Sequence, residues 1–378
     1  MTPLETRLRE ELQSSPPMTF AAFMELALYD PQHGYYSSGV KRTGWDGDFV
    51  TSPEIDPAFG ALWTRAIEQT WEAAGRPTPF HLIEVGAGEG GFAEAVLDSA
   101  SGRFRSSLRY AIVERVPEVA ARQRERLGTT RVSWVPALED VGVVADGCIV
   151  ANEVLDNHPV HLVERRDGVL SELYVGAENG RLHLQPGEVS NPAIGRYVDS
   201  YGLATNDGAR AEVGLAAASF ASAVAGSLAR GTIFLIDYGT TSDQLALREG
   251  GTLVTYGAGA GEDALEAPGD RDITSHVNWS AIADALSSRG ADVAPLVSQG
   301  DALRALGLDE LHAALRRDHA DAVASGRGVD AVRTLSRSQA LGVLTDPGGL
   351  GGLQVLVASK NLDPPLTLTP NACSPPPG

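Results

Sequence analysis

The segment 82–91, LIEVGAGEGG, constrains the fold of this chain more than any other. A short apolar run leads into closely spaced glycines, and an apolar helical pattern follows from about Phe92. Glycine allows the backbone to turn sharply and to approach a ligand closely, while the N-terminal end of the next helix carries a partial positive charge. The segment therefore predicts a strand, a ligand-binding turn and a helix.

Short apolar runs and helical patterns alternate along the chain from residue 81. In order they are HLIEVG, AEAVLDSA, LRYAIVE, PEVAARQRERL, RVSWVP and GCIVANEV. This alternation is typical of parallel strands joined by crossover helices. Together with the later runs TIFLIDYG, GTLVTYG and GGLQVLVASK, it predicts an α/β fold with a Rossmann-like sheet of about seven strands, the last of them reversed.

Further parts precede, interrupt and follow this pattern. Residues 1–75 predict an N-terminal helical arm with a loop that caps the cofactor or substrate. The main domain is predicted at 76–360, with an insertion at about 158–230. Strands in the insertion alternate around the turn signals Asp-Gly and Asn-Gly, as in a β-meander, which we interpret as a substrate wall or lid. Residues 361–378 are rich in proline and predict a disordered tail.

The composition restricts the partners. The formal net charge is −19, from 49 acidic and 30 basic residues, so the chain lacks the basic surface that nucleic acid or anionic lipid requires. We therefore expect no nucleic-acid partner and no membrane association. A basic, arginine-bearing protein suits this charge better than an anionic partner does.

The cysteines and histidines predict a reduced protein without a metal site. Cys148 and Cys373 show no metal-ligand spacing, and the N-terminus has no apolar targeting run, so we expect a cytoplasmic location. His158 and His161 lie three residues apart at a predicted strand start, where their side chains point apart, and no third ligand is near.

The glycine turn alone does not select a cofactor. The glycines that shape it are Gly86, Gly88 and Gly90. With Gly91 in third place, the same letters also match the G-x-G-x-x-G of a dinucleotide fold. Glu84, two residues before the turn, suits a cationic cofactor better than a pyrophosphate and favours S-adenosylmethionine over NAD. Glu114 ends the second strand, where an acid accepts the ribose hydroxyls of either cofactor.

Several separate motifs occur in an order that is known from one family. They are MTFAAFMELALYDPQHGYY, GDFVTSPEIDPAFG, the glycine turn, NEVLDNHPV, LIDYG and PGDRDITSHVNW. Over about residues 16–358 the chain resembles the MidA-type methyltransferases, a family that includes the mitochondrial methyltransferase of complex I assembly. The resemblance implies a class I methyltransferase fold that binds S-adenosylmethionine. For the mitochondrial member it implies methylation of an arginine side chain on a protein.

The resemblance also places an N-terminal signature beside the cofactor pocket. The matching residues here are Asp48, Thr51, Ser52 and Glu54. In the alternative interpretation, Ser52, Pro53 and Glu54 only begin a helix.

The segment ANEVLDNHPV supplies the candidates for the acceptor side. It follows the fourth strand, and open parallel sheets bind ligands at the carboxyl ends of their strands. The candidates are Glu153 first, then Asp156, together with Asn152. Carboxylates would pair with the N–H groups of a guanidinium and orient one nitrogen for attack. In the alternative, Asp156 and Asn157 cap the next element, and only Glu153 faces the pocket.

A histidine and a departure from the family pattern complete the acceptor side. His276, in DITSHV, matches the family motif and is a candidate polar or general-base group, although a structural histidine is the alternative. The stretch 257–269, GAGAGEDALEAPG, departs from the family pattern, in which an arginine and a histidine are usual. The departure bears on acceptor specificity more than on fold or cofactor.

The leading interpretation is an S-adenosylmethionine-dependent methyltransferase that acts on a protein arginine. Two alternatives stay open. An NAD-dependent oxidoreductase would need a pair such as Tyr-x-x-x-Lys after the fourth strand, and the chain has none there. A cofactor-binding assembly factor would keep the fold as a docking module with little catalysis.

Overall fold

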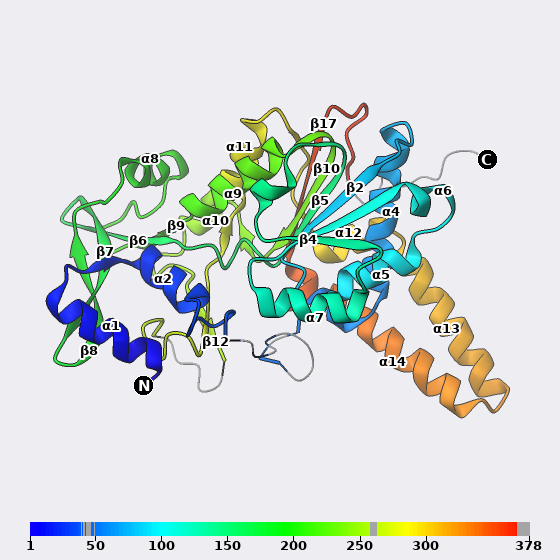
Figure 1. Ribbon diagram of the computed structural model, residues 1–378, viewed down its shortest axis with the longest axis horizontal. Coiled ribbons are helices and arrows are strands. Elements are labelled where there is room, and N and C mark those ends of the chain that lie inside the picture. The colour runs from blue at the N-terminus through cyan, green and yellow to red at the C-terminus, as the bar shows by residue number, and fades with distance from the viewer. Residues whose placement is uncertain (39, 41, 43–46, 49, 258–262, 369–378) are drawn as a thin grey trace. The chain divides into compact units, whose positions relative to one another are not determined.

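The computed structural model describes residues 1–38, 40, 42, 47–48, 50–257 and 263–368 (Figure 1). The chain divides into two compact units, each built from three stretches. We call residues 43–152, 224–237 and 289–378 the sheet unit, and residues 1–42, 153–223 and 238–288 the meander unit. Within the described ranges, no helix is long and apolar enough to cross a membrane.

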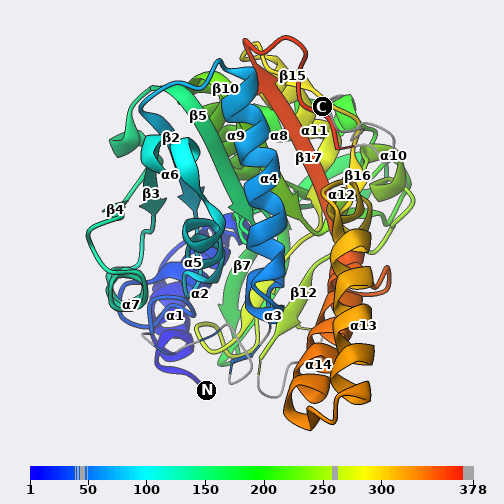
Figure 2. The same ribbon diagram turned by 90° about the vertical axis from the view of Figure 1, so that its right-hand side faces the viewer.

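An eight-stranded sheet forms the centre of the sheet unit (Figure 2). Its strands are β2 (Phe80–Val85), β3 (Leu108–Val113), β4 (Val132–Val135), β5 (Val144–Asn152), β10 (Leu228–Asp237), β15 (Asp292–Val293), β16 (Val297–Ser298) and β17 (Gln354–Lys360). Seven follow the order β15-β17-β10-β5-β2-β3-β4, and β16 also pairs with β17. The strands from β4 to β10 are parallel, and β17 is antiparallel to β10. The predicted α/β fold with a reversed last strand is confirmed.

Helices connect these strands and cover the sheet. They are α3 (Ser52–Ile55), α4 (Ala58–Ala73), α5 (Gly91–Ser99), α6 (Gly102–Ser107), α7 (Pro117–Leu127), α12 (Gln299–Ala305), α13 (Leu308–Ala324) and α14 (Gly328–Thr345), with short 3-10 turns at Leu138–Val141 and Leu350–Gly352. Helix α4 packs on β5 and β10, and the ring centroids of Trp63 and Phe234 lie 5.3 Å apart. Phe59, Trp63 and Ile67 recur at helical spacing and are all buried, so α4 forms because it covers the sheet with an apolar face. Helices α13 and α14 pack against each other as a projecting hairpin (Figure 1).

One predicted sheet strand lies elsewhere. The run GTLVTYG contains β12 (Val254–Tyr256), which pairs with β13 (Asp272–Thr274) in a two-stranded sheet of the meander unit. The expectation that it continues the main sheet is therefore wrong, and β15 lies beside β17 instead. Apolar and β-branched letters indicate a strand, but they do not show which strand it pairs with.

The predicted disordered tail begins too early. The Leu366 backbone N–H donates to Ser359 Oγ of β17 at 3.0 Å, and Leu368 is buried in the main core. The prediction is wrong for 361–368 because these leucines anchor the segment on the sheet, while 369–378 lie outside the described residues.

Antiparallel strands form the main sheet of the meander unit. Its strands are β1 (Met18–Thr19), β6 (His161–Arg166), β7 (Val169–Glu178), β8 (Arg181–Gly187) and β9 (Arg210–Val213). Asp167-Gly168 joins β6 to β7 and Asn179-Gly180 joins β7 to β8, and all four residues have positive φ between 51° and 76°. Two consecutive left-handed residues define the type I′ turn that these dipeptides predict. The β-meander is therefore confirmed.

The remaining elements of the meander unit are short. They are α1 (Pro3–Ser14), α2 (Phe20–Tyr29), α8 (Pro192–Tyr201), α9 (Leu215–Gly226, which ends in the sheet unit), β11 (Gly239–Thr240), α10 (Ser242–Leu245), β14 (Val277–Asn278) and α11 (Trp279–Ser287). Thr19 caps α2, because its hydroxyl accepts the Ala22 N–H at 3.2 Å. Helix α1 packs on β7, so residues 1–42 belong with the inserted strands. The predicted boundary at 75/76 cuts through the sheet unit, which includes 43–152.

Two glycines allow the central strands of the sheet unit to approach one another. Gly231 of β10 stands opposite Gly147 of β5, which stands opposite His81 of β2. A Cβ atom on Gly231 would collide with the Gly147 carbonyl oxygen, and one on Gly147 would collide with the His81 carbonyl oxygen. Gly231 also has φ +142°, which side chains disfavour.

We predict that Gly231→Ala lowers the free energy of unfolding by about 3 kcal/mol or more, because strand separation and backbone strain add. Chemical denaturation monitored by circular dichroism measures the change. Gly226→Ala is the control, since a Cβ there has no neighbour within 4 Å, and its effect should stay within about 1 kcal/mol. Equal unfolding midpoints for the two variants would contradict the prediction.

Candidate cofactor and acceptor sites

The glycine turn of the sheet unit has the geometry that the sequence predicts. Gly86, Gly88 and Gly90 have φ values of +67°, +52° and +87°, which residues other than glycine rarely adopt. The turn continues the sheet, since the Gly86 N–H donates to the carbonyl oxygen of Val113 at 3.0 Å. Helix α5 then begins at Gly91, so its N-terminus follows the turn directly.

Glu114 follows β3 at the same edge of the sheet. Its Oε1 accepts the Val116 N–H at 2.9 Å, and its Oε2 accepts an N–H of the Gln123 side chain at 3.1 Å. Burial raises the pKa of Glu114 above its ordinary value, whereas these two hydrogen bonds act in the opposite direction. A carboxylate held in this way can accept further hydrogen bonds from ligand hydroxyls.

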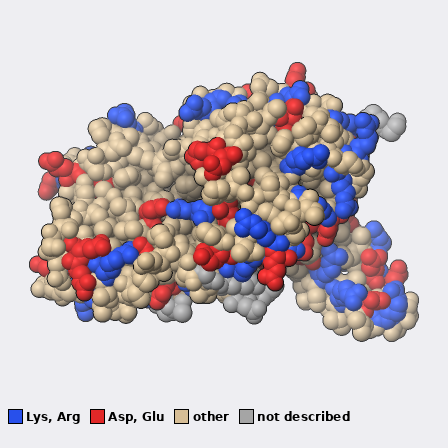
Figure 3. Space-filling model, viewed as in Figure 1, with Lys and Arg blue, Asp and Glu red and all other residues tan. Residues whose placement is uncertain are grey.

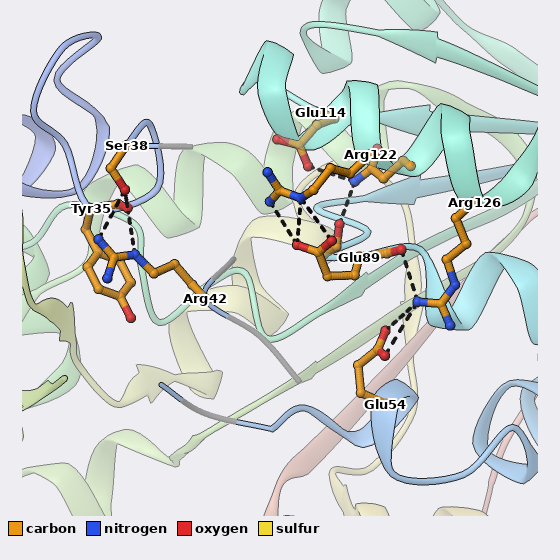
Figure 4. Close-up of polar contacts among 10 residues, drawn as sticks. Tyr35, Ser38, Arg42, Glu54, Glu89, Glu114, Arg122 and Arg126 are labelled. Atoms are coloured by element: carbon orange, nitrogen blue, oxygen red, sulfur yellow. Dashed lines mark hydrogen bonds and ion pairs between the residues drawn. The ribbon is translucent and has the colours of Figure 1, made fainter. Parts of the chain in front are cut away.

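Helix α7 holds the turn from outside, which the sequence reading missed (Figure 4). Arg122 binds the Glu89 carboxylate, with its Nη2 2.8 Å from Oε1 and its Nε 3.0 Å from Oε2. Arg126 donates to the Glu89 carbonyl oxygen at 3.1 Å and contacts Glu94 of α5 at 2.9 Å. The charged face of a crossover helix looks solvent-exposed in sequence, so nothing there indicated these contacts.

The N-terminal signature meets the glycine turn through Glu54. Arg126 Nη1 donates to Glu54 Oε1 at 3.1 Å, and a Cβ on Gly91 would collide with the same oxygen. Gly91, the third glycine of the G-x-G-x-x-G match, therefore leaves room for a carboxylate of this chain.

The rest of the signature is part of the scaffold. Ser52 is fully buried, and its hydroxyl donates to Gln299 Oε1 at 3.0 Å. Thr51 precedes the short helix α3, so the alternative in which this segment begins a helix is correct about the backbone. Asp48 is exposed. Contact of Thr51, Ser52 or Glu54 with the cofactor stays a prediction.

Glu84 is buried in β2, with 5% of its surface exposed. The Tyr110 hydroxyl donates to Glu84 Oε2 at 2.6 Å. Burial raises the pKa of Glu84 to about 7, while the bond from Tyr110 lowers it and the nearby Glu114 raises it. The carboxyl group that the sequence assigned to a cationic cofactor is thus close to half-protonated at neutral pH.

The acceptor-side candidates begin where β5 ends. Asn152 is the last residue of β5, and Glu153 follows with a left-handed backbone, φ +53°. Asp156 is 6% exposed, and its carbonyl oxygen accepts the Ser275 N–H at 3.1 Å. The next element is a strand, β6, so Asp156 and Asn157 cap no helix there, and the alternative in which only Glu153 faces the pocket stays open. The roles of Asn152, Glu153 and Asp156 in catalysis stay predictions.

A buried polar network surrounds this segment in the meander unit, and the sequence reading did not single it out. Tyr36 Oη lies 3.0 Å from both Asn157 Oδ1 and Asp272 Oδ2, and Asn157 Nδ2 donates to Asp272 Oδ1 at 3.0 Å. Burial raises the pKa of Asp272 to about 7. Tyr36 and Asp272 lie inside the motifs HGYY and GDRDIT, but their letters gave no sign that they meet.

His276 lies in a different part of the meander unit. Its backbone N–H donates to the Thr252 hydroxyl at 3.0 Å, and Thr252 in turn donates to the buried Glu212 carboxylate. His276, Glu212 and Asn278 line a cavity of about 20 Å³, which has room for about one water molecule. Burial and the charge of Arg248 lower the pKa of His276 below its ordinary value. Its general-base role stays a prediction.

His158 and His161, the pair considered above as metal ligands, each contact another group of the protein through Nδ1. His158 Nδ1 lies 2.9 Å from the Val154 carbonyl oxygen, and His161 Nδ1 lies 2.7 Å from Glu172 Oε1. Among the described residues, no group of three or more potential ligands could hold a metal ion.

On the face shown in Figure 3, basic side chains lie among acidic ones and do not form one continuous patch.

Comparisons with known proteins identify the family. A family model of S-adenosyl-L-methionine-dependent methyltransferases matches residues 62–297. A protein from Burkholderia thailandensis, crystallised with S-adenosylhomocysteine bound, is 31% identical and superimposes with a TM-score of 0.83 over 96% of this chain and 93% of that chain. The chain belongs to this family of S-adenosylmethionine-dependent methyltransferases. Membership decides the cofactor and sets the NAD-dependent alternative aside.

Two curated relatives of this methyltransferase come from animals. The mitochondrial protein arginine methyltransferase NDUFAF7 of Bos taurus is 27% identical over 342 residues, which cover 82% of this chain and 74% of that protein. The NDUFAF7 homolog of Drosophila melanogaster, also named as a mitochondrial protein arginine methyltransferase, is 26% identical over 322 residues, or 76% and 70% of the two chains.

The residues of this methyltransferase fit S-adenosylmethionine. Three glycines with positive φ leave three positions of the turn without a side chain, and Glu114 offers a held carboxylate for ribose hydroxyls. The effect of segment 257–269 on acceptor specificity stays a prediction, because residues 258–262 lie outside the described residues.

The raised pKa of Glu84 makes the stability of the methyltransferase depend on pH. Because the folded pKa of about 7 exceeds the ordinary value of 4.5, the stabilisation is complete below pH 4.5 and is lost as the pH rises through 7. Wild type should lose roughly 3 kcal/mol relative to Glu84→Gln between these limits. Urea unfolding of both proteins from pH 5 to pH 8 measures the difference. Exposed Glu118→Gln is the control, and a wild-type profile parallel to that of Glu84→Gln would refute the assignment.

Proposed function

We propose that this methyltransferase transfers the methyl group to an arginine side chain of a protein. The names of the animal relatives support the acceptor, at about a quarter sequence identity. The net charge of −19 supports a basic partner. We also propose that it acts in the cytoplasm, as the sequence predicts, although those relatives are named mitochondrial.

The observation that carries the proposal is the pair of buried carboxylates beside Tyr36. Asp156 and Asp272 are 6% and 3% exposed, and Asp272 Oδ2 accepts the Tyr36 hydroxyl at 3.0 Å. Burial, and after it the charges of these two aspartates, raise the pKa of Tyr36 and of Tyr256. Carboxylates bind the planar N–H fork of a guanidinium, and aromatic faces stack on it.

The proposed chemistry uses residues of this chain in two roles. When bound, S-adenosylmethionine supplies a methyl group on a positively charged sulfur. Glu153 and Asp156 accept N–H bonds from the guanidinium and orient one nitrogen toward the methyl carbon. As the new N–C bond forms and the S–C bond breaks, the nitrogen loses a proton to the Glu153 carboxylate. Glu153 then releases this proton to water.

We expect Glu153→Gln to lower methyl transfer by at least about 100-fold, because general-base contributions are of this size. Binding of S-adenosylmethionine should change by less than about threefold, since the affected interaction is with the acceptor. Radiolabelled methyl transfer and titration calorimetry measure the two effects. Exposed Glu178→Gln serves as the matched control, and undiminished turnover in Glu153→Gln would remove this residue from the catalytic role.

The acceptor itself can be identified from a cell extract. We expect incubation with the protein and isotope-labelled S-adenosylmethionine to label arginine side chains of a protein, located by peptide mass spectrometry, and Asp156→Asn to reduce that label. A labelled small molecule with unlabelled protein would contradict the arginine proposal. Cofactor binding without any labelled product would favour the assembly-factor alternative.

A further inference from the structure

Gln123 is a fully buried polar residue on helix α7. Its side-chain amide contacts the segments that follow β2 and β3 and a residue within β4. Nε2 donates to the Gly88 carbonyl oxygen at 2.8 Å and to Glu114 Oε2 at 3.1 Å, and Oε1 accepts the indole N–H of Trp134 at 3.0 Å. Burying an amide is costly unless its polar groups are hydrogen-bonded, and here the NH2 group and the carbonyl oxygen both have partners.

Trp134 determines which way the amide points. An indole nitrogen can only donate, so the oxygen of Gln123 must face β4, where Trp134 lies. Both N–H groups of Gln123 then face the Gly88 carbonyl oxygen and Glu114. The amide therefore has one orientation, and the Trp134 side chain on β4 sets it.

The two contacts on Glu114 leave a defined pair of acceptor positions. Oε1 accepts the Val116 N–H and Oε2 accepts Gln123, one bond on each oxygen. A carboxylate accepts about four hydrogen bonds, so each oxygen retains a further position. Two adjacent acceptors at a fixed angle match the two vicinal O–H donors of a ribose.

We propose that Gln123 is a positioning residue for the cofactor. It holds the Glu114 carboxylate in the rotamer that accepts the ribose diol, and it fixes the Gly88 carbonyl so that the glycine turn keeps its shape. Gln123 acts through Glu114 and does not itself bind the ribose. The proposal depends on the cofactor of the family and not on the identity of the acceptor, so an acceptor other than arginine leaves it unaffected.

The test compares two ligands by titration calorimetry: S-adenosylhomocysteine and its 2′-deoxyribose analogue. Wild type should bind the first at least about tenfold more tightly, since a hydrogen bond to a charged group is lost in the second. Gln123→Met keeps the length of the side chain but lacks both N–H donors. We expect it to bind S-adenosylhomocysteine about tenfold more weakly and to lose most of the discrimination between the two ligands.

Three further variants decide between positioning and mere support of the fold. Glu114→Gln should abolish the discrimination, and adding Gln123→Met to it should cost little more, because both changes act on the same bonds. Trp134→Phe keeps Gln123 but removes the indole N–H that orients its amide. Discrimination between the two ligands should therefore fall in this variant too. If Gln123→Met does not fold, Trp134→Phe tests the proposal in its place. Exposed Glu125→Ala on α7 should behave as wild type.

Two results would overturn the proposal. One is a ratio of the two dissociation constants that stays at the wild-type value in Gln123→Met and in Trp134→Phe, while both ligands bind more weakly. The other is a wild-type protein that does not discriminate the two ligands.

Discussion

The in-register pairing of β3, β2 and β5 is the constraint on which the cofactor side depends. Val85 stands opposite Val113 on one side and Ala151 on the other, so the three parallel strands end together. The residues that follow, Gly86, Glu114 and Asn152, therefore meet at one edge of the sheet. A shift of one residue in either pairing would turn the side chains of a strand to its opposite face and separate this set. The apolar residues of these strands fix the register because they must be buried.

The features predicted correctly from sequence are those that local chemistry determines. The glycine turn needs positive φ at three positions, and the Asp-Gly and Asn-Gly dipeptides need it at their hairpins, so these letters specify the backbone directly. Glu114 was found because an acid directly after a strand has a predictable place. The strand VTY was misplaced because its composition does not encode its partner.

Residues that act across the fold could not be predicted in this way. Gln123 lies in a run of charged residues, PEVAARQRERL, and its burial depends on how α7 rotates against the glycine turn. Tyr36 and Asp272 are separated by 236 positions, and only the folding of the meander unit brings them together. Both were inside recognised motifs, so the resemblance marked their neighbourhood, whereas their hydrogen bonds required the structure. Buried polar pairs are specified by tertiary packing, and a single sequence carries no periodic signal for them.

The contact between Gly91 and Glu54 links two motifs that lie 37 positions apart in the printed sequence. A methyl group at Gly91 would occupy the position of the Glu54 carboxylate, and Arg126 would then lose one of its partners. A larger residue at position 91 therefore requires the Glu54 carboxylate to move or position 54 to become smaller. The side chain at one motif thus limits which residues the other motif accepts.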